Sequence, residues 1–141
     1  MYFEDSDARG ITFNGDGTKL FMVGSENDNV YTYNLSTAYD LGSTSYNQNF
    51  DISGQESDPT SVRFGESGTK MFVVGKDTDS VYSYDLSTAY DISSASYNQS
   101  FEVSGEDDQP TGLQFNGDGS KMFVVGRSTD TVYQYSSTEE K

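Results

Sequence analysis

The chain has 141 residues, with 8 basic and 23 acidic side chains and a net charge of −15 at neutral pH. This charge argues against nucleic acid and anionic membranes as partners, because phosphate groups are bound by clustered lysine and arginine. Cys and His are absent, which excludes disulfides, thiolate metal sites and the histidine-dependent sites of serine and cysteine hydrolases. Aromatic residues make up 14% of the chain, too many for a disordered acidic segment.

The most informative feature of the sequence is a repeat of 51 residues. Phe13, Phe64 and Phe115 are separated by this interval, and residues 11–61 match residues 62–112 at 27 of 51 positions. Self-similarity at such a period is typical of repeat architectures, in which each unit buries its face against the next. The repeat therefore predicts the architecture, although it does not by itself predict what the chain acts on.

Each repeat contains four predicted β-strands and no segment with helical periodicity. The strands of the second repeat are predicted at 60–64, 70–75, 81–86 and 96–103. The first two flank a tight turn whose counterpart in the first repeat contains Asp-Gly, a strong hairpin signal. The second strand is apolar on both faces, which predicts burial between two sheets. The fourth breaks its alternation once, so we expect a β-bulge there.

The stretch Phe-Asn-Gly-Asp-Gly-Thr-Lys-Leu-Phe-Met-Val-Gly at 13–24 recurs with changes at 64–75 and 115–126. It resembles the first hairpin of YVTN-type and NHL-type bacterial β-propeller repeats. The resemblance covers nearly the whole chain and implies an all-β fold of four-stranded propeller blades, in agreement with the period. It is not specific for activity, because such repeats serve many roles. A parallel β-helix is the alternative architecture, and its shorter turn period disfavours it.

The repeats divide the chain into one domain of three units. These are blade 1 at 1–58, blade 2 at 59–109, a partial blade 3 at 110–136 and a tail at 137–141. The third unit lacks its outer strand, and propellers close with about 4–8 blades. Because two apolar end faces would stay exposed, we expect the chain to close into a ring with copies of itself. A homodimer would have six blades and a homotrimer nine; a piece of a longer array is the alternative.

Candidate site residues lie at positions where the three repeats differ and in turns that contain several carboxylates. One equivalent position carries three different side chains, which makes it a candidate ligand contact: Ser25, Lys76 and Arg127. Acidic turns expected on the same face of the ring add three more candidates: Asp28, Asp79 and Asp130. Carboxylates of this kind could hold Ca²⁺ through oxygen ligands. Local hydrogen bonds to the backbone explain Asp in turns more simply, so this explanation is favoured.

No catalytic residue, metal site or cofactor is predicted. Without His, paired carboxylates are the main remaining catalytic arrangement, and Asp107 and Asp108 would face opposite ways in an extended chain. We therefore expect a non-catalytic propeller scaffold or interaction module that self-assembles, rather than an enzyme. One alternative is a glycan- or Ca²⁺-binding module, with Tyr39 and Tyr90 as exposed aromatics, and a less favoured one is a propeller hydrolase.

The cellular location is not indicated by the sequence. No signal peptide and no transmembrane segment is recognised in it. The acidic composition is compatible with an extracellular or virion-surface setting, where a glycan or another protein would be the ligand.

Overall fold

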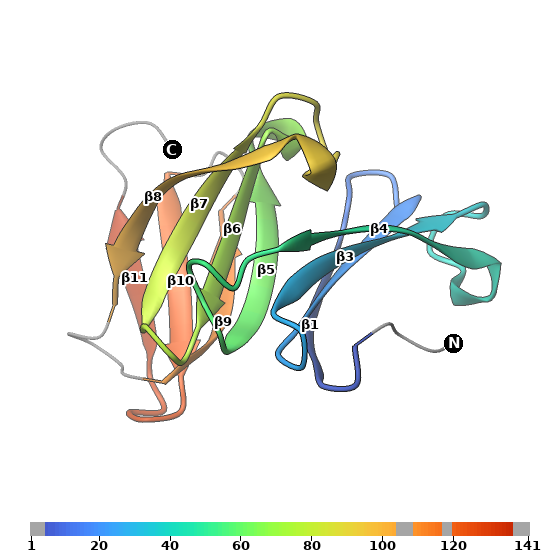
Figure 1. Ribbon diagram of the computed structural model, residues 1–141. Helices are drawn as coiled ribbons and strands as arrows, with labels where there is room; N and C mark the ends of the chain where they lie inside the picture. The colour runs from blue at the N-terminus through green and yellow to red at the C-terminus, as the bar shows by residue number, and fades with distance from the viewer. Residues whose placement is uncertain (1–4, 104–108, 117–119, 137–141) are drawn as a thin grey trace.

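The computed structural model describes residues 5–103, 109–116 and 120–136. This part of the chain is all-β, with three antiparallel sheets of four, four and three strands. Its only helices are three short 3₁₀ turns, so the described residues contain no helix suited to cross a bilayer. The sheets follow one another as three blades (Figure 1). The predicted all-β class and the missing outer strand of the third unit are confirmed for the described residues.

The strands follow the predicted repeat closely. Blade 1 contains β1 (Ala8–Phe13), β2 (Lys19–Gly24), β3 (Asn29–Leu35) and β4 (Thr44–Asp51). Blade 2 contains β5 (Pro59–Gly65), β6 (Lys70–Gly75), β7 (Ser80–Leu86) and β8 (Ala95–Glu102). Blade 3 contains β9 (Pro110–Phe115), β10 (Lys121–Gly126) and β11 (Val132–Ser136). Consecutive strands pair within each blade, and the three first strands, β1, β5 and β9, are neighbours across the blades.

The predicted β-bulge lies in the outer strand of both four-stranded blades. In the β7–β8 ladder, Gln99 and Tyr97 pair with successive residues of β7, so Asn98 has no partner in the ladder. Asn47 has the equivalent place in β4. The bulge accounts for the break in alternation, and it leaves Tyr97 edge-on to the ring of Tyr84, with 5.8 Å between the ring centroids.

The side chains of β2 alternate between two buried apolar faces. Phe21 and Val23 face blade 2 and join a core cluster that includes Met71 of β6. Leu20 and Met22 point the other way, into a separate cluster with the tyrosines of β3. The second strand is therefore buried on both faces, as its sequence predicts.

Neighbouring blades pack through one repeated aromatic contact. The rings of Phe21 and Phe64 lie 4.3 Å apart between blades 1 and 2, and those of Phe72 and Phe115 lie 4.5 Å apart between blades 2 and 3. Both pairs are tilted to a similar degree, and each residue of the second pair is 51 positions after its counterpart in the first. Aromatic pairs of this kind contribute about 0.5–1.5 kcal/mol beyond the apolar area that they bury.

Blade 3 exposes the positions that blades 1 and 2 bury. Val125 is 38% exposed and Val132 65% exposed, whereas their equivalents in the first two blades are at most 4% exposed. The other end of the stack is partly covered. On blade 1, Leu20 and Met22 are buried, but Ile11 is 51% exposed, whereas its equivalents Val62 and Leu113 are at most 3% exposed. Apolar side chains are therefore exposed at both ends, and the larger open apolar face lies at blade 3.

Two hairpins depend on glycine in the left-handed region. Gly17 has φ of 77° and Gly68 of 92°, and a Cβ at either position would overlap the ring of a tyrosine, Tyr39 or Tyr90. Each tyrosine N–H donates to the carbonyl of the glycine beneath it. Tyr39 is exposed, as predicted, but Tyr90 also packs 5.3 Å from the ring of Phe64, at the boundary between blades. These aromatics therefore hold the long connections onto the hairpins.

We predict that Gly17→Ala destabilises the chain, whereas Gly15→Ala in the same turn does not. The Gly17 substitution forces an L-residue into the left-handed region, which costs about 1–2 kcal/mol, and it displaces the Tyr39 ring. Gly15 has open space around the position of a Cβ, which makes it the matched control. Urea unfolding of the three proteins measures the difference, and equal midpoints for the two variants would contradict the prediction.

Candidate functional site

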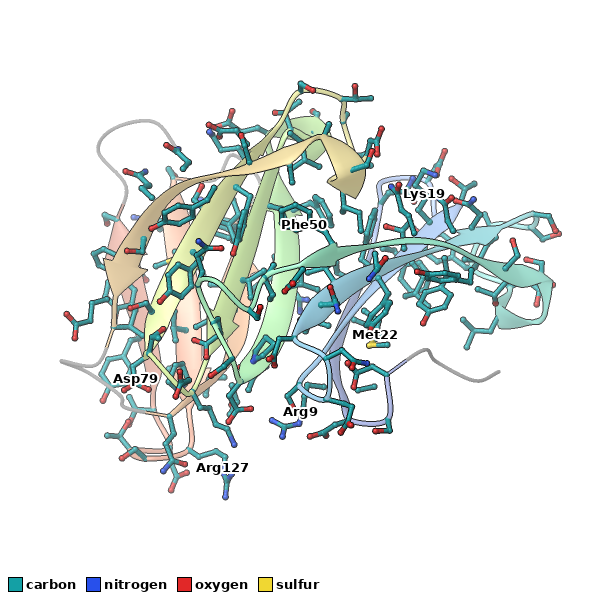
Figure 2. All side chains as sticks on the ribbon, in the orientation of Figure 1. Arg9, Lys19, Met22, Phe50, Asp79 and Arg127 are labelled. Carbon is teal, nitrogen blue, oxygen red and sulfur yellow. The ribbon has the colours of Figure 1, made fainter. Side chains whose placement is uncertain are left out.

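Charged side chains gather at the end of the blades where β1 and β5 begin. Figure 2 places Arg9, Asp79 and Arg127 at this end and Lys19 at the opposite end. The turns between the second and third strands also lie here, because their backbone bonds to the segments that precede β1 and β5: Ser25 N–H donates to Asp7 O, and Lys76 N–H to Asp58 O. We call this the charged end of the blades.

Arg9 is the centre of an ionic network between blades 1 and 2. Its Nε and Nη2 donate to the two carboxylate oxygens of Asp7, both at 2.9 Å, and its Nη1 donates to Asp58 at 3.3 Å. Ser25 Oγ donates to Asp7 at 2.6 Å, and Lys76 Nζ lies 4.0 Å from Asp58. Two predicted site residues, Ser25 and Lys76, therefore belong to one network that joins the two blades.

The network sets the protonation of its members. The Arg9 guanidinium, with a smaller contribution from the Ser25 hydroxyl, lowers the pKa of Asp7 to about 2. The hydrogen bond from Arg9 to Asp7 in turn raises the pKa of Arg9. Both groups are therefore charged at any pH at which the chain is expected to work.

A buried carboxylate holds the loops at the charged end in each of the first two blades. Glu56 is 1% exposed and accepts hydrogen bonds from the backbone N–H groups of Asp58, Asp77 and Thr78 and from the Thr78 hydroxyl. Asp5, also buried, does the same in blade 1, with the backbone N–H groups that follow the second strand there. Part of the acidity that the sequence places at this end is thus structural.

Asp28 is a carboxylate in unfavourable surroundings. Its Oδ1 is buried and accepts no hydrogen bond from the described part of the chain. Burial raises the pKa of Asp28, and the carboxylates of Asp5, Asp51 and Asp58 raise it further. Asp28 therefore keeps its proton to higher pH than an ordinary aspartate and accepts a proton more readily once ionised.

The other predicted positions are distributed among the three blades. Asp28, Asp79 and Asp130 all have φ near 55°, and the carbonyls of the first two accept hydrogen bonds from Ile52 and Val103. The three aspartates thus occupy one turn position in successive blades. Arg127 is exposed, and its backbone N–H donates to Gln109. The acidic residues at 106–108 and the tail at 137–141 lie outside the described residues, as do 1–4 and 117–119.

Three residues that organise this end, Asp5, Asp7 and Arg9, were not predicted from the sequence, and neither was the structural role of Glu56. The signal for the buried carboxylates was available, because positions 5, 56 and 107 are all acidic and 51 residues apart. Arg9 has no basic counterpart in the other repeats, so the pattern gave no reason to select it. Among the described residues, no group of three or more side chains is arranged to hold a metal ion.

No protein-family model matches the sequence, and no curated protein sequence matches it. Solved structures do resemble it. One is described as a 6-phosphogluconolactonase from Bacteroides uniformis, with a TM-score of 0.68 at 14% identity over 94% of this chain and 38% of that one. The periplasmic gluconolactonase of Pseudomonas aeruginosa has a TM-score of 0.60 at 14% identity, over 92% of this chain and 36% of its own.

A third similar structure is the β-propeller domain of Cps50 from Myceliophteria thermophila, with a TM-score of 0.61 at 13% identity over 92% of this chain and 37% of that one. At such identities the likeness shows the fold alone, and the predicted β-propeller architecture is confirmed by it. The chain spans less than two fifths of the length of each of these structures.

The similar structures correct the functional expectation. The prediction of a non-catalytic scaffold that is not an enzyme is wrong, because several of the similar propellers are named as lactonases, which are hydrolases. The physical reason for the error is that the absence of His excludes particular mechanisms rather than catalysis itself. A carboxylate in apolar or like-charged surroundings, such as Asp28, can serve as an acid or base without histidine.

We predict that Glu56→Ala lowers the free energy of unfolding by about 3 kcal/mol, because several buried donors lose a charged acceptor. Glu56→Asp is the matched control, since Asp5 performs the same role in blade 1, and it should cost clearly less. Chemical denaturation measures both. A Glu56→Ala protein as stable as the unsubstituted chain would show that the loops are held by other contacts.

Proposed function

We propose that this chain contributes to a propeller hydrolase that opens lactones of sugar acids. The observation that carries the proposal is the similarity of the three blades to structures named as 6-phosphogluconolactonase and gluconolactonase. The chain spans about 38% of the length of the first of these, so the complete activity is part of the proposal. We also propose that the blades are of the YVTN or NHL type, which the hairpin motif at 13–24, 64–75 and 115–126 supports.

The charged end of the blades supplies the groups that lactone opening needs. Hydrolysis requires a base that takes a proton from water, so that the hydroxide attacks the ring carbonyl, and a cation near the oxyanion that forms. Ionised Asp28 is the proposed base. Lys76 is the proposed cation, because its ammonium is only loosely paired with Asp58, at 4.0 Å. The ring oxygen leaves as a hydroxyl after it takes up the proton, and the product is the open hydroxy acid.

Asp28 and Lys76 share Asp58 as a neighbour. The Asp58 carboxylate contributes to the raised pKa of Asp28 and pairs with Lys76. By contrast, the guanidinium of Arg9 is bonded to two carboxylates, so less of its charge is available to an oxyanion. The ammonium of Lys76, with a single carboxylate at 4.0 Å, is the more available of the two cations.

We predict that the chain accelerates the opening of glucono-δ-lactone or its 6-phosphate above the spontaneous rate, as measured by acid release in a pH-stat. Asp28→Asn should remove most of the acceleration, about 100-fold for loss of a general base. In the unsubstituted chain the rate should fall as the pH drops through the raised pKa of Asp28, because only the ionised carboxylate accepts a proton.

The controls separate the site from the scaffold. Lys76→Gln should slow the reaction, whereas Lys19→Gln, at the opposite end of the blades (Figure 2), should not. Acid release no faster than in buffer, from folded protein and with both lactones, would contradict the proposed activity.

We further propose that a second copy of the chain packs on the open apolar face of blade 3. Val125 and Val132 support this proposal, because the equivalent valines of blades 1 and 2 are buried by the next blade. On the outer face of blade 1, Leu20 and Met22 are already buried and Ile11 is exposed. This face offers less apolar surface than blade 3, so the partner is proposed to use its own blade 3. The six-blade and nine-blade rings stay predictions.

We predict that the chain has twice its monomer mass of 15.5 kDa in light scattering at micromolar concentration, and that Val132→Asp returns it to a monomer. Ile11→Asp is the control, because Ile11 is an exposed apolar residue of blade 1. Dissociation by both variants would indicate head-to-tail contacts instead, and a monomeric unsubstituted chain would contradict self-association.

A further inference from the structure

Arg63 occupies a position on β5 that the blade does not require to be basic. Its equivalents are Thr12 on β1 and Gln114 on β9. The residues that flank this position keep their character in all three repeats, with an aliphatic residue before it and phenylalanine after it. The same strand forms with Thr, Arg or Gln here, so the arginine is a property of blade 2 rather than of the fold.

The guanidinium of Arg63 is held by backbone carbonyls. Its Nη1 donates to the carbonyl of Val62 at 2.8 Å and reaches across to the carbonyl of Ile11 on β1 at 3.1 Å. The side chain thus lies at the junction of the first strands of blades 1 and 2. Both bonds are donated by one nitrogen and fix the orientation of the side chain. Within the described residues, Nε and Nη2 donate no hydrogen bond.

Arg63 also has no acidic partner among the residues that the structure describes, in a chain with 23 acidic side chains. Arg9 shows the alternative: it donates to Asp7 through two nitrogens and to Asp58 through a third. Arg63 is half-buried, and this burial lowers its pKa. A partly desolvated cation without a counterion is unfavourable, and an anion of matching shape relieves that cost.

We propose that Arg63 is the anion-binding residue of a small-molecule site at the first strands of the blades, and that its ligand carries a carboxylate or phosphate group. The Nε and Nη2 groups of a guanidinium form the fork that binds two oxygens of either group at once. The inference does not require hydrolysis: it concerns recognition of the charged group, and it holds or fails by binding alone.

The neighbouring first strand adds a neutral polar group at the same level of the repeat. Gln114 Oε1 accepts a hydrogen bond from the N–H of Phe115, which leaves the amide nitrogen of Gln114 as a donor. Arg63 is the cation of this site and Gln114 its neutral donor. Because Gln114 can bond to a charged or a neutral ligand, the preference for an anion over a neutral sugar depends on Arg63. Long-range repulsion from the net charge of −15 is screened beyond about 8 Å at physiological salt.

The experiment is calorimetric titration of the folded chain with gluconate and, separately, with inorganic phosphate. Arg63→Gln should weaken binding of the recognised anion roughly tenfold or more. Because Gln is the residue that blade 3 has at this position, the variant is compatible with the strand. Arg63→Lys keeps the charge but loses the fork, so its binding should be intermediate.

Lys121→Gln is the matched control, because it removes one positive charge from an exposed side chain that is assigned to no site, and its binding should equal that of the unsubstituted chain. Gluconate binding without phosphate binding assigns the site to carboxylates, and the reverse assigns it to phosphate. The NMR signal of the Arg63 Nε–H in the unsubstituted chain should shift during the titration, which tests the contact without a substitution.

Three results would overturn the inference: no binding of either anion, equal affinity in Arg63→Gln, or equal affinity in Arg63→Lys and the unsubstituted chain. Its failure is distinguishable from failure of the proposed hydrolase. Loss of lactone opening in Asp28→Asn with anion binding intact supports both proposals. Anion binding in a chain that opens no lactone supports the Arg63 site alone.

Discussion

The structure depends on one constraint: each blade is a single sheet that is apolar on both faces, and so it is stable only between two covers. Neighbouring blades cover each other through a repeated phenylalanine contact, with ring centroids 4.3 Å apart between blades 1 and 2 and 4.5 Å apart between blades 2 and 3. Burial of apolar area dominates the stabilisation of such stacks. The same constraint explains why blade 3, which repeats the valines of its neighbours, exposes them.

The turns at the charged end follow from that stacking. Radial packing of the blades brings the segment before each first strand beside the turn between the second and third strands, where backbone N–H groups need acceptors. Glu56 and Asp5 supply them. The remaining charges differ in their surroundings. Arg9 is paired with carboxylates, whereas burial shifts the pKa of Asp28 and of Arg63 against their charged forms.

Sequence and structure agree where the interaction is local or repeated. The strands, the Asp-Gly turn and the bulge at Asn98 are visible in the pattern, because alternation and turn chemistry act over a few residues. The 3₁₀ turn at Ile92–Ser94 was not predicted: its cap comes from Asp91, and three residues are too few to give a periodic signal. The site was found only in part. Differences among the repeats identified Lys76 as a candidate. The carboxylate that pairs with it belongs to Asp58, which lies 18 positions earlier in the chain, so the pair could not be predicted from the pattern.

By itself, the sequence determined the period, the all-β class and the number of blades, because a 51-residue repeat of alternating apolar residues leaves few other ways to bury them. Only the tertiary structure decided which charges are paired. Glu56 and Asp28 are both acidic residues of polar loops in the sequence. Backbone donors bond to Glu56, whereas Asp28 has a buried oxygen that accepts no hydrogen bond from the described part of the chain. Which carboxylate is hydrogen-bonded depends on how loops from different parts of a blade meet in space. The sequence pattern does not predict these contacts.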